Sequence, residues 1–158
     1  MSDPRFGFFE DFSPGQRIRH QRGATISDVE NNLVTKLVMN TAEGHWNDHA
    51  MRDSPLGSGR IVFGLVTASL VFGLASQDTA EQALAELGCS GLRFTGPVHV
   101  GDTLYAYTEV TDCRPSEHRG DAGLVEFKHW GLRDDEDVVF EAQRTVLLKR
   151  RSHWVSSQ

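Results

Sequence analysis

An amide and an imidazole stand five positions apart at Asn40 and His45. Histidine suits general acid–base chemistry because an imidazole titrates at about pH 6.5, close to physiological pH. Asparagine cannot take up a proton, but its oxygen and its NH₂ group can hold and orient a water molecule. Asp48, His49 and Asp53 follow closely and could supply a further acid–base group if the chain folds back there. The spacing alone does not distinguish a proton-transfer site centred on His45 from a structural loop histidine.

A helix is predicted immediately before this pair. Ser27 and Glu30 form a capping box, in which each side chain satisfies a free backbone N–H of the other residue. The helix is predicted to run to about Asn40. Its apolar residues recur at helical spacing and give it one apolar face, formed by Val29, Leu33, Val34, Leu37 and Val38. Two simpler interpretations stay open: Asn40 as a left-handed residue at the helix C-terminus, and His45 as a loop histidine that caps the helix.

A second helix is predicted after the polar, glycine-rich loop Thr41–Gly59. From Arg60 the sequence IVFGLVTASLVFGLAS is apolar on every side, which predicts a helix that is buried all round. This run is shorter than the roughly 18 residues that a membrane span needs. The start of such a helix offers unpaired backbone N–H groups and the positive end of the helix dipole, both of which favour an anion. Gly64 would let a ligand approach the main chain there, or could serve helix–sheet packing alone.

The second half of the chain is rich in β-branched and aromatic residues, broken by turn-forming ones. Strands are predicted at Gly91–Val98, Thr103–Cys113, Gly123–Arg133 and Val138–Lys149, after a polar strand at Gln16–Thr25 and a polar turn or helix extension at Asp78–Leu87. A chain of 158 residues fits a single domain, here residues 1–158 with a core of about 9–149. The order of elements predicts an α+β fold in which one antiparallel sheet wraps around a buried central helix.

The chain resembles the MaoC-like dehydratases, a family of hotdog-fold proteins that includes the (R)-specific enoyl-CoA hydratases. The resemblance rests on three stretches, Met39–His45, Arg60–Leu70 and Phe94–Leu104. The first is similar in spacing to the family's Asp-x-x-x-x-His signature, the second to the start of its central helix, and the third to its strand–turn–strand. With these separations, the resemblance extends from roughly Phe9 to Lys149 and implies a single hotdog domain.

The resemblance also implies a lyase that adds water across the α,β double bond of an acyl thioester or removes it, as an enoyl-CoA hydratase or 3-hydroxyacyl-CoA dehydratase. His45 then matches the acid–base histidine, Asn40 the residue that orients water, and the Gly64 N–H the donor to the thioester oxygen, where negative charge develops. Two positions depart from the family pattern. Asn40 replaces the usual aspartate and leaves His45 as the one acid–base group of the motif, and Phe63 replaces a common histidine with an aromatic wall.

Two other functions stay open. A hotdog acyl-CoA thioesterase would need a carboxylate or an activated water facing the thioester carbonyl carbon, and the predicted central helix has no obvious Asp or Glu for this role. A non-catalytic, acyl-CoA-binding subunit of a hetero-oligomer is the third hypothesis, and the Asn40 replacement motivates it. Thiol release identifies the thioesterase, and binding without turnover identifies the subunit.

Composition and charge narrow the partners. A formal net charge of -6 without a basic stripe argues against nucleic-acid binding. Two cysteines without CxxC spacing and scattered histidines predict neither a structural disulfide nor a metal site, and no cofactor is expected. The N-terminus lacks the apolar core of a signal peptide, so the expected location is the cytoplasm, without a membrane partner. We expect an acyl-CoA thioester as substrate. The open edge of a lone hotdog sheet predicts at least a homodimer, and the resemblance places the acyl pocket at or near that interface.

Overall fold

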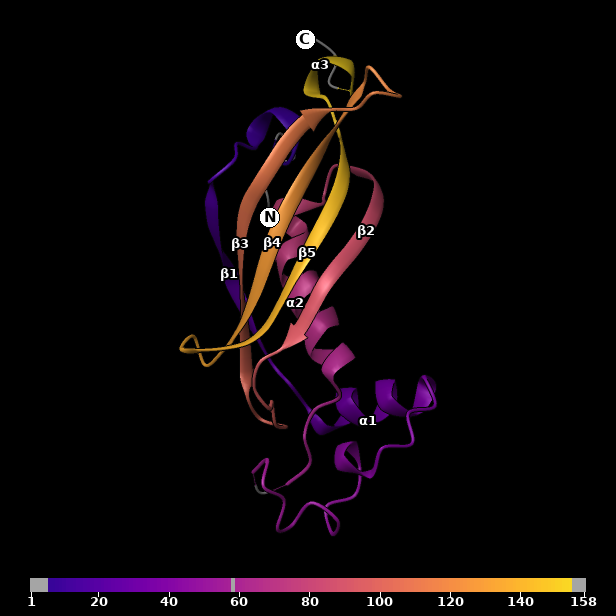
Figure 1. Cartoon of the computed structure of the whole chain (residues 1–158), viewed down its shortest axis with the longest axis vertical. Coiled ribbons are helices and arrows are strands. Elements are labelled where there is room, and N and C mark those ends of the chain that lie inside the picture. The colour runs from indigo at the N-terminus through magenta and orange to yellow at the C-terminus, as the bar shows by residue number, and fades with distance from the viewer. Residues whose placement is uncertain (1–5, 58, 155–158) are drawn as a thin grey trace.

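The computed structural model describes residues 6–57 and 59–154, which form a curved antiparallel sheet around one long helix (Figure 1). The strands and the two main helices are β1 (Arg17–Thr25), α1 (Asp28–Leu37), α2 (Gly64–Thr79), β2 (Ala83–Phe94), β3 (Thr103–Pro115), β4 (Ala122–Arg133) and β5 (Asp137–Lys149). Short helical turns are η1 (Phe9–Asp11), η2 (Glu43–His45) and α3 (Arg151–Trp154). The predicted order of one strand, a helix, a loop, a second helix and four strands is confirmed.

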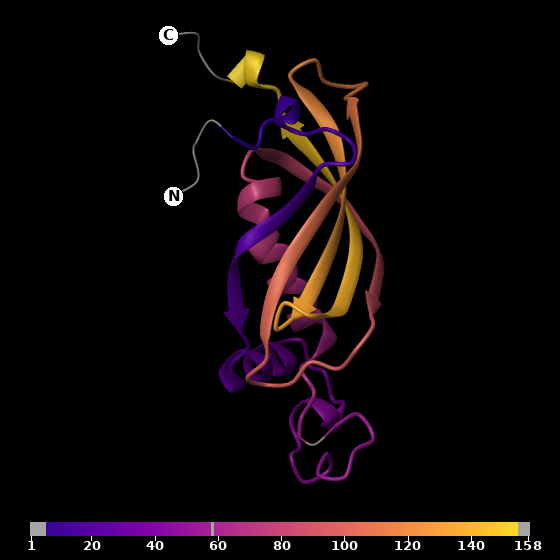
Figure 2. The ribbon, with the colours of Figure 1, turned by 90° about the vertical axis from the view of Figure 1, so that its left-hand side faces the viewer.

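The sheet has the strand order β1-β3-β4-β5-β2, and every neighbouring pair is antiparallel. Its strands curve around α2, which lies on the concave side (Figure 2). The prediction of an α+β fold with an antiparallel sheet wrapped around a central helix is thus confirmed. β1 and β2 form the two edges of the sheet, and an edge strand leaves backbone groups available for pairing.

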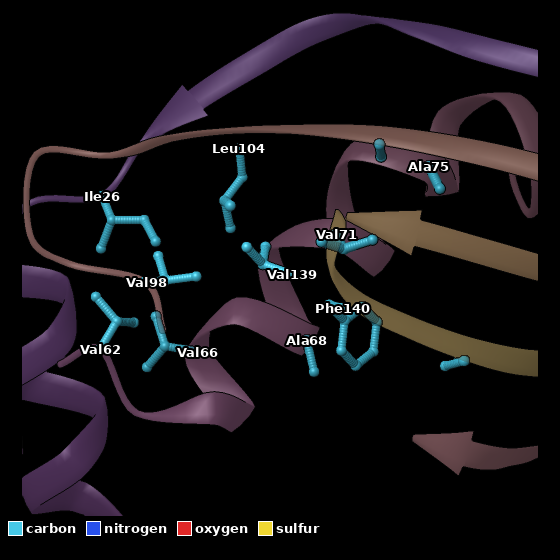
Figure 3. Packing of buried hydrophobic residues seen from close by; sticks show 12 residues of the cluster. Ile26, Val62, Val66, Ala68, Val71, Ala75, Val98, Leu104, Val139 and Phe140 are labelled. Carbon is cyan, nitrogen blue, oxygen red and sulfur yellow. The ribbon is translucent and has the colours of Figure 1, made fainter. Parts of the chain in front are cut away.

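The main core lies between α2 and the sheet (Figure 3). Its largest contributions come from α2 and from the strands opposite it, through Val66, Ala68, Val71, Ala75, Leu104, Val139 and Phe140, each at most 3% exposed. α2 approaches β4 closely at Gly131, where a Cβ atom would lie 2.5 Å from the Val71 side chain. Because that distance is too short for any Cβ, this position requires glycine, and the tight packing fixes α2 against the sheet.

The prediction that α2 is buried on every side is wrong for one stripe of the helix. Leu65, Ser69 and Gly73 are spaced four residues apart and are all exposed. The sheet covers the other side of α2, and an apolar composition does not reveal how many sides of a helix are covered. Among the described residues, no helix is long and apolar enough to cross a bilayer.

β2 begins at Ala83 rather than at Gly91, so the polar turn or helix extension predicted over Asp78–Leu87 is correct for residues 78–82 and wrong for residues 83–87. Residues 83–90 are rich in alanine, leucine and glutamate, which favour helices. Pairing with β5, from Ala83 opposite Leu148 to Phe94 opposite Phe140, supplies backbone hydrogen bonds that override this local preference.

α1 is oriented against its own apolar pattern. The predicted capping box is present, with Ser27 and Glu30 bonding each other's backbone N–H groups, and the helix ends at Leu37, before a left-handed residue at Met39. Most of the apolar face points outward: the exposed fractions of Val29, Leu33, Leu37 and Val38 lie between 55% and 72%, while Val34 is partly buried against the core. The residues of α1 that are fully buried are polar, Asn31 and Thr35. A face that is apolar and open to solvent is typical of an interaction surface.

Candidate active site

A cavity of about 450 Å³ lies at the N-terminal end of α2. The three stretches of the chain that carry the family resemblance converge on it, although they are far apart in sequence. Its lining consists of His45, Leu56, Ile61, Val62, Gly64, Thr67, Phe94, Thr95, Gly96, Pro97, Val98 and Val139. The walls are mainly apolar, and their polar members are one imidazole, two threonines and the start of a helix. This composition is typical of a small-molecule site.

His45 ends the short helical turn η2 and belongs to the lining of the cavity. Its Nδ1 lies 3.0 Å from the backbone oxygen of Ile61. A carbonyl oxygen can only accept, so Nδ1 carries the hydrogen and, in the neutral imidazole, Nε2 carries the lone pair. The ring also packs against Phe63, with 5.3 Å between ring centroids, although Phe63 itself is not among the residues that line the cavity. The neutral ring can therefore act as a base through Nε2.

Gly64 is the first residue of α2, and its backbone N–H has no acceptor within the described part of the chain. Unpaired N–H groups at a helix start carry partial positive charge and favour an anionic oxygen. A Cβ at this position would lie 3.0 Å from the ring of Phe94, a distance that few Cβ contacts reach. The absence of a side chain thus leaves room beside the backbone N–H at the cavity wall.

Asn40 does not line the cavity. Its side-chain oxygen accepts a hydrogen bond from the backbone N–H of Ala42 at 2.9 Å. The backbone N–H of Asn40 donates to the backbone oxygen of Thr35, near the end of α1. These contacts shape the turn that leads from α1 to His45. The structure therefore brings His45 and Gly64 together at one cavity and leaves Asn40 in the adjoining turn. The water-orienting role of Asn40 stays a prediction.

The acidic residues after His45 do not pair with it. Asp48 forms an ion pair with Arg60 at 2.7 Å, while Asp53 and His49 are exposed. Of the carboxylates in the described residues, none lies within ion-pair distance of the His45 ring. The same residues hold no group of three or more potential metal ligands. His45 is thus the one titratable side chain of the cavity lining.

One residue of the site gave no signal in the sequence. Asn31 is 0% exposed and bonds both the backbone oxygen of His45 and the backbone N–H of Phe63. It occupies the side of α1 opposite the apolar stripe, where the helical pattern predicts a solvent-facing residue. Sequence spacing alone offers no means of finding such a contact, because its partners lie 14 and 32 positions away.

Comparison with known proteins identifies the family. The family model for mesaconyl-CoA hydratase matches residues 7–150, nearly the whole chain. The chain belongs to the mesaconyl-CoA hydratase family. A mesaconyl-CoA hydratase of Haloarcula marismortui is 33% identical over 153 residues, which cover 90% of this chain and 42% of that protein.

Solved structures extend the likeness to the fold. A Chloroflexus aurantiacus protein described as a MaoC domain protein dehydratase superposes with a TM-score of 0.83 at 30% identity, over 91% of this chain and 45% of that one. A Mycobacterium tuberculosis protein described as having a double hotdog fold gives a TM-score of 0.81 at 25% identity, over 99% of this chain and 48% of that one. The family member described here is a hotdog domain that resembles MaoC-like dehydratases, as predicted. It spans less than half the length of these relatives.

Proposed function

We propose that this chain catalyses the addition of water to an enoyl-CoA thioester and the reverse dehydration of a 3-hydroxyacyl-CoA. The observation that carries the proposal is the meeting of His45 and the unpaired Gly64 N–H at one apolar cavity. The family supports this chemistry, since named members are mesaconyl-CoA hydratases and a β-methylmalyl-CoA dehydratase. We also propose that the enzyme acts in the cytoplasm.

The thioester carbonyl oxygen is bound by the Gly64 N–H. Attack of water on the β-carbon moves electron density onto this oxygen, and the helix N-terminus stabilises the resulting enolate. The side of Gly64 where a Cβ would stand is narrowed by Phe94, so a glycine at this position keeps the donor accessible. The apolar wall of Leu56, Ile61 and Val139 accommodates the acyl chain.

His45 transfers the proton. Its Nε2 takes a proton from water as the oxygen bonds the β-carbon, and the imidazolium then gives a proton to the α-carbon of the enolate. The two steps add one OH and one H to the double bond and return His45 to its neutral form. A single group must do both because no carboxylate of the described residues pairs with this ring. Asn40 lies outside the cavity lining and shapes the turn that carries His45, so the water-orienting role proposed for it would act from this turn.

The test is an assay of the purified chain with trans-2-enoyl-CoA substrates of increasing length and with mesaconyl-CoA. We expect hydration, and we expect His45→Ala to reduce kcat by about 10³-fold, as removal of a general acid–base group does. His49→Ala is the matched control, since this exposed histidine lies four positions away and should leave kcat unchanged. Absence of turnover across the panel contradicts the proposal.

Two outcomes of the same assay identify the alternatives. Release of free thiol from acyl-CoA would reveal a thioesterase, which the cavity disfavours because its lining within the described residues contains no Asp or Glu. Tight acyl-CoA binding without turnover, followed by activity when a companion chain is added, would reveal a non-catalytic subunit. Hydration by the chain alone excludes both as its main function.

We further propose that the active unit contains two copies of the chain. Relatives carry about twice this length, and one of them is described as a double hotdog. β2 is an open sheet edge on which Leu87 and Phe94 are about half exposed, and the outer face of α1 is apolar and exposed. Figure 1 shows α1 below the lower end of the sheet, and Figure 2 shows it on the side of β1 and α2. A second copy would have to pack on both the β2 edge and the outer face of α1 to cover these two surfaces.

Light scattering after size exclusion tests the dimer. We expect the mass of two chains for the native protein and of one chain for the double variant Leu33→Glu/Leu37→Glu, since each charge would be buried in the interface. Val138→Glu serves as a control, because Val138 is also an exposed apolar residue but lies on β5. A monomeric native protein contradicts this part of the proposal, and so does a double variant that still has the mass of two chains.

A further inference from the structure

The side chain of Asn31 forms a bridge between the two halves of the candidate active site. Its Nδ2 donates to the backbone oxygen of His45 at 2.8 Å, and its Oδ1 accepts from the backbone N–H of Phe63 at 2.9 Å. The residue is 0% exposed. A buried amide is costly unless it is hydrogen-bonded, and here the donor and the acceptor ends each hold a different segment of the site.

The two segments that Asn31 joins also bond each other directly. The backbone N–H of Ile61 donates to Gly44 at 3.0 Å, and the His45 ring donates to Ile61. These two hydrogen bonds, one between backbone groups and one from the ring, connect the turn η2 to the residues just before α2. Asn31 adds the third connection, between the backbone oxygen of His45 and the backbone N–H of Phe63. Together they fix where the imidazole stands relative to the first turn of α2.

Asn31 also determines which backbone N–H at the start of α2 is the first one without an acceptor. It occupies the N–H of Phe63, so the next donor along the chain, that of Gly64, is the first one left without an acceptor. The Gly64 N–H, at a residue that lines the cavity, is thus the first donor of the helix start that remains for a substrate oxygen. Without Asn31, the Phe63 N–H would lose its acceptor and the turn carrying His45 would lose one of its anchors.

We propose that Asn31 is a positioning residue, which sets the distance and angle between the His45 imidazole and the Gly64 N–H. The inference rests on the proposed hydration, but it concerns a residue that touches neither substrate nor reacting atoms. Its effect falls on kcat rather than on KM, because misplacing a catalytic group by about 1 Å costs on the order of 10²-fold in rate.

Asn31→Ala and Thr35→Ala form a matched pair. Both residues are fully buried on the same side of α1, one turn apart, but the Thr35 hydroxyl has no partner among the described residues. We expect both variants to lower the unfolding temperature, and only Asn31→Ala to lower kcat by about 10²-fold with KM little changed. Equal kcat values for the two folded variants would overturn the proposal.

Asn31→Asp supplies a signature that a general loss of stability does not produce. A protonated carboxyl group matches the amide, with one acceptor oxygen and one O–H donor, whereas the carboxylate has no donor for the His45 carbonyl. Burial raises the pKa of a carboxyl group, so protonation is accessible at mildly acidic pH. We expect the ratio of variant to native kcat to rise as the pH falls. A ratio independent of pH contradicts the proposal.

A measurement without substrate separates this inference from the proposed function. ¹⁵N NMR of the histidine rings, with His45 assigned through His45→Ala, reports which ring nitrogen carries the hydrogen. We expect the Nδ1–H form in the native protein and a mixture of both neutral forms in Asn31→Ala, with no such change in Thr35→Ala. If the native chain proves inactive, the proposed function fails, and an unchanged His45 spectrum in Asn31→Ala would independently overturn the positioning role.

Discussion

The two ends of α2 both face histidines, and the histidines differ in what surrounds them. At the N-terminal end, His45 bonds one carbonyl through Nδ1 and lines an apolar cavity with the rest of its ring. Toward the C-terminal end, His20 and His129 are at most 1% exposed and belong to a chain of hydrogen bonds. Proximity to a helix therefore does not distinguish the histidine proposed to be catalytic from the buried ones, whereas access to a cavity does.

The buried chain of hydrogen bonds links α2 to three adjacent strands. Asp78 on α2 bonds His20 Nδ1 at 2.7 Å, and Thr108 bonds both His20 Nε2 and His129 Nδ1 at 2.7 Å each. Burial, together with the nearby positive charge of Arg144, lowers the pKa of His129 to about 3. His129 is therefore neutral at physiological pH and, without access to solvent, contributes packing and hydrogen bonding rather than proton transfer.

Exchanging each histidine for glutamine separates the two roles most strongly. His45→Gln should lower kcat by at least about 10³-fold while the unfolding temperature changes little, since the ring is part of the cavity wall. His129→Gln should leave kcat within about twofold and lower the unfolding free energy by roughly 2 kcal/mol, because it disturbs a fully buried site. Steady-state kinetics and urea unfolding of the same preparations measure both. A large kcat loss in His129→Gln would remove the distinction.

The pH dependence of stability sharpens the contrast. The folded protein keeps His129 neutral, with its pKa at about 3, whereas the unfolded chain protonates it at the ordinary 6.5. Between these values the unfolded state binds more protons, so the unfolding free energy falls as the pH drops below 6.5, by up to roughly 1.4 kcal/mol per pH unit. Above pH 6.5 this contribution is constant. Urea unfolding from pH 7.5 to 4.5 should show a shallower dependence in His129→Gln, and equal slopes would contradict the buried neutral state.

A methyl group at the N-terminal end should affect rate rather than stability. Gly64→Ala brings a Cβ to 3.0 Å from Phe94 and crowds the N–H beside it. We expect kcat/KM to fall about tenfold, less than the roughly 10²–10³-fold cost of removing an oxyanion donor altogether. Gly73→Ala is the control on the same helix, because a Cβ there meets nothing within 4 Å. A silent Gly64→Ala would argue against substrate contact at this N–H.

The smallest effect is expected at Asp78, the partly exposed end of the buried chain of hydrogen bonds. Asp78→Asn keeps an oxygen that can accept from His20 but removes the carboxylate charge. We expect a loss of about 1 kcal/mol in unfolding free energy and an unchanged kcat. Thermal unfolding followed by circular dichroism is sufficient to measure it. A rate effect here would mean that the two ends of α2 communicate.

The sequence predicts the overall architecture because hydrophobic patterns and turns report local structure well. The capping box at Ser27, the apolar run after Arg60 and three of the four late strands lie close to their predicted positions. β2 starts eight residues earlier than predicted, because pairing with β5 outweighs the helix preference of residues 83–90. His45 and Gly64 were both predicted at the site, and the structure places them on one cavity.

What the sequence leaves undetermined is which side of an amphipathic helix is covered. Periodicity shows that the residues of α1 divide into an apolar and a polar face, but both faces are compatible with the same pattern. In the structure the polar side is inward, because Asn31 finds two backbone partners contributed by distant segments. Contacts of this kind depend on the folded arrangement of the loop after α1, so they cannot be predicted from the spacing of residues along the chain.

The two-sided character of α1 has a consequence for how the protein behaves on dilution. Its inner face holds the segments that carry His45 and Gly64. On its outer face, Val29, Leu33 and Leu37 are exposed in the single chain. If a second copy covers that face, the position of α1, and with it the shape of the cavity, depends on protein concentration through mass action. Specific activity would then decline below the dissociation constant of the dimer and recover on concentration. In that case α1 would make catalytic competence a property that two chains share.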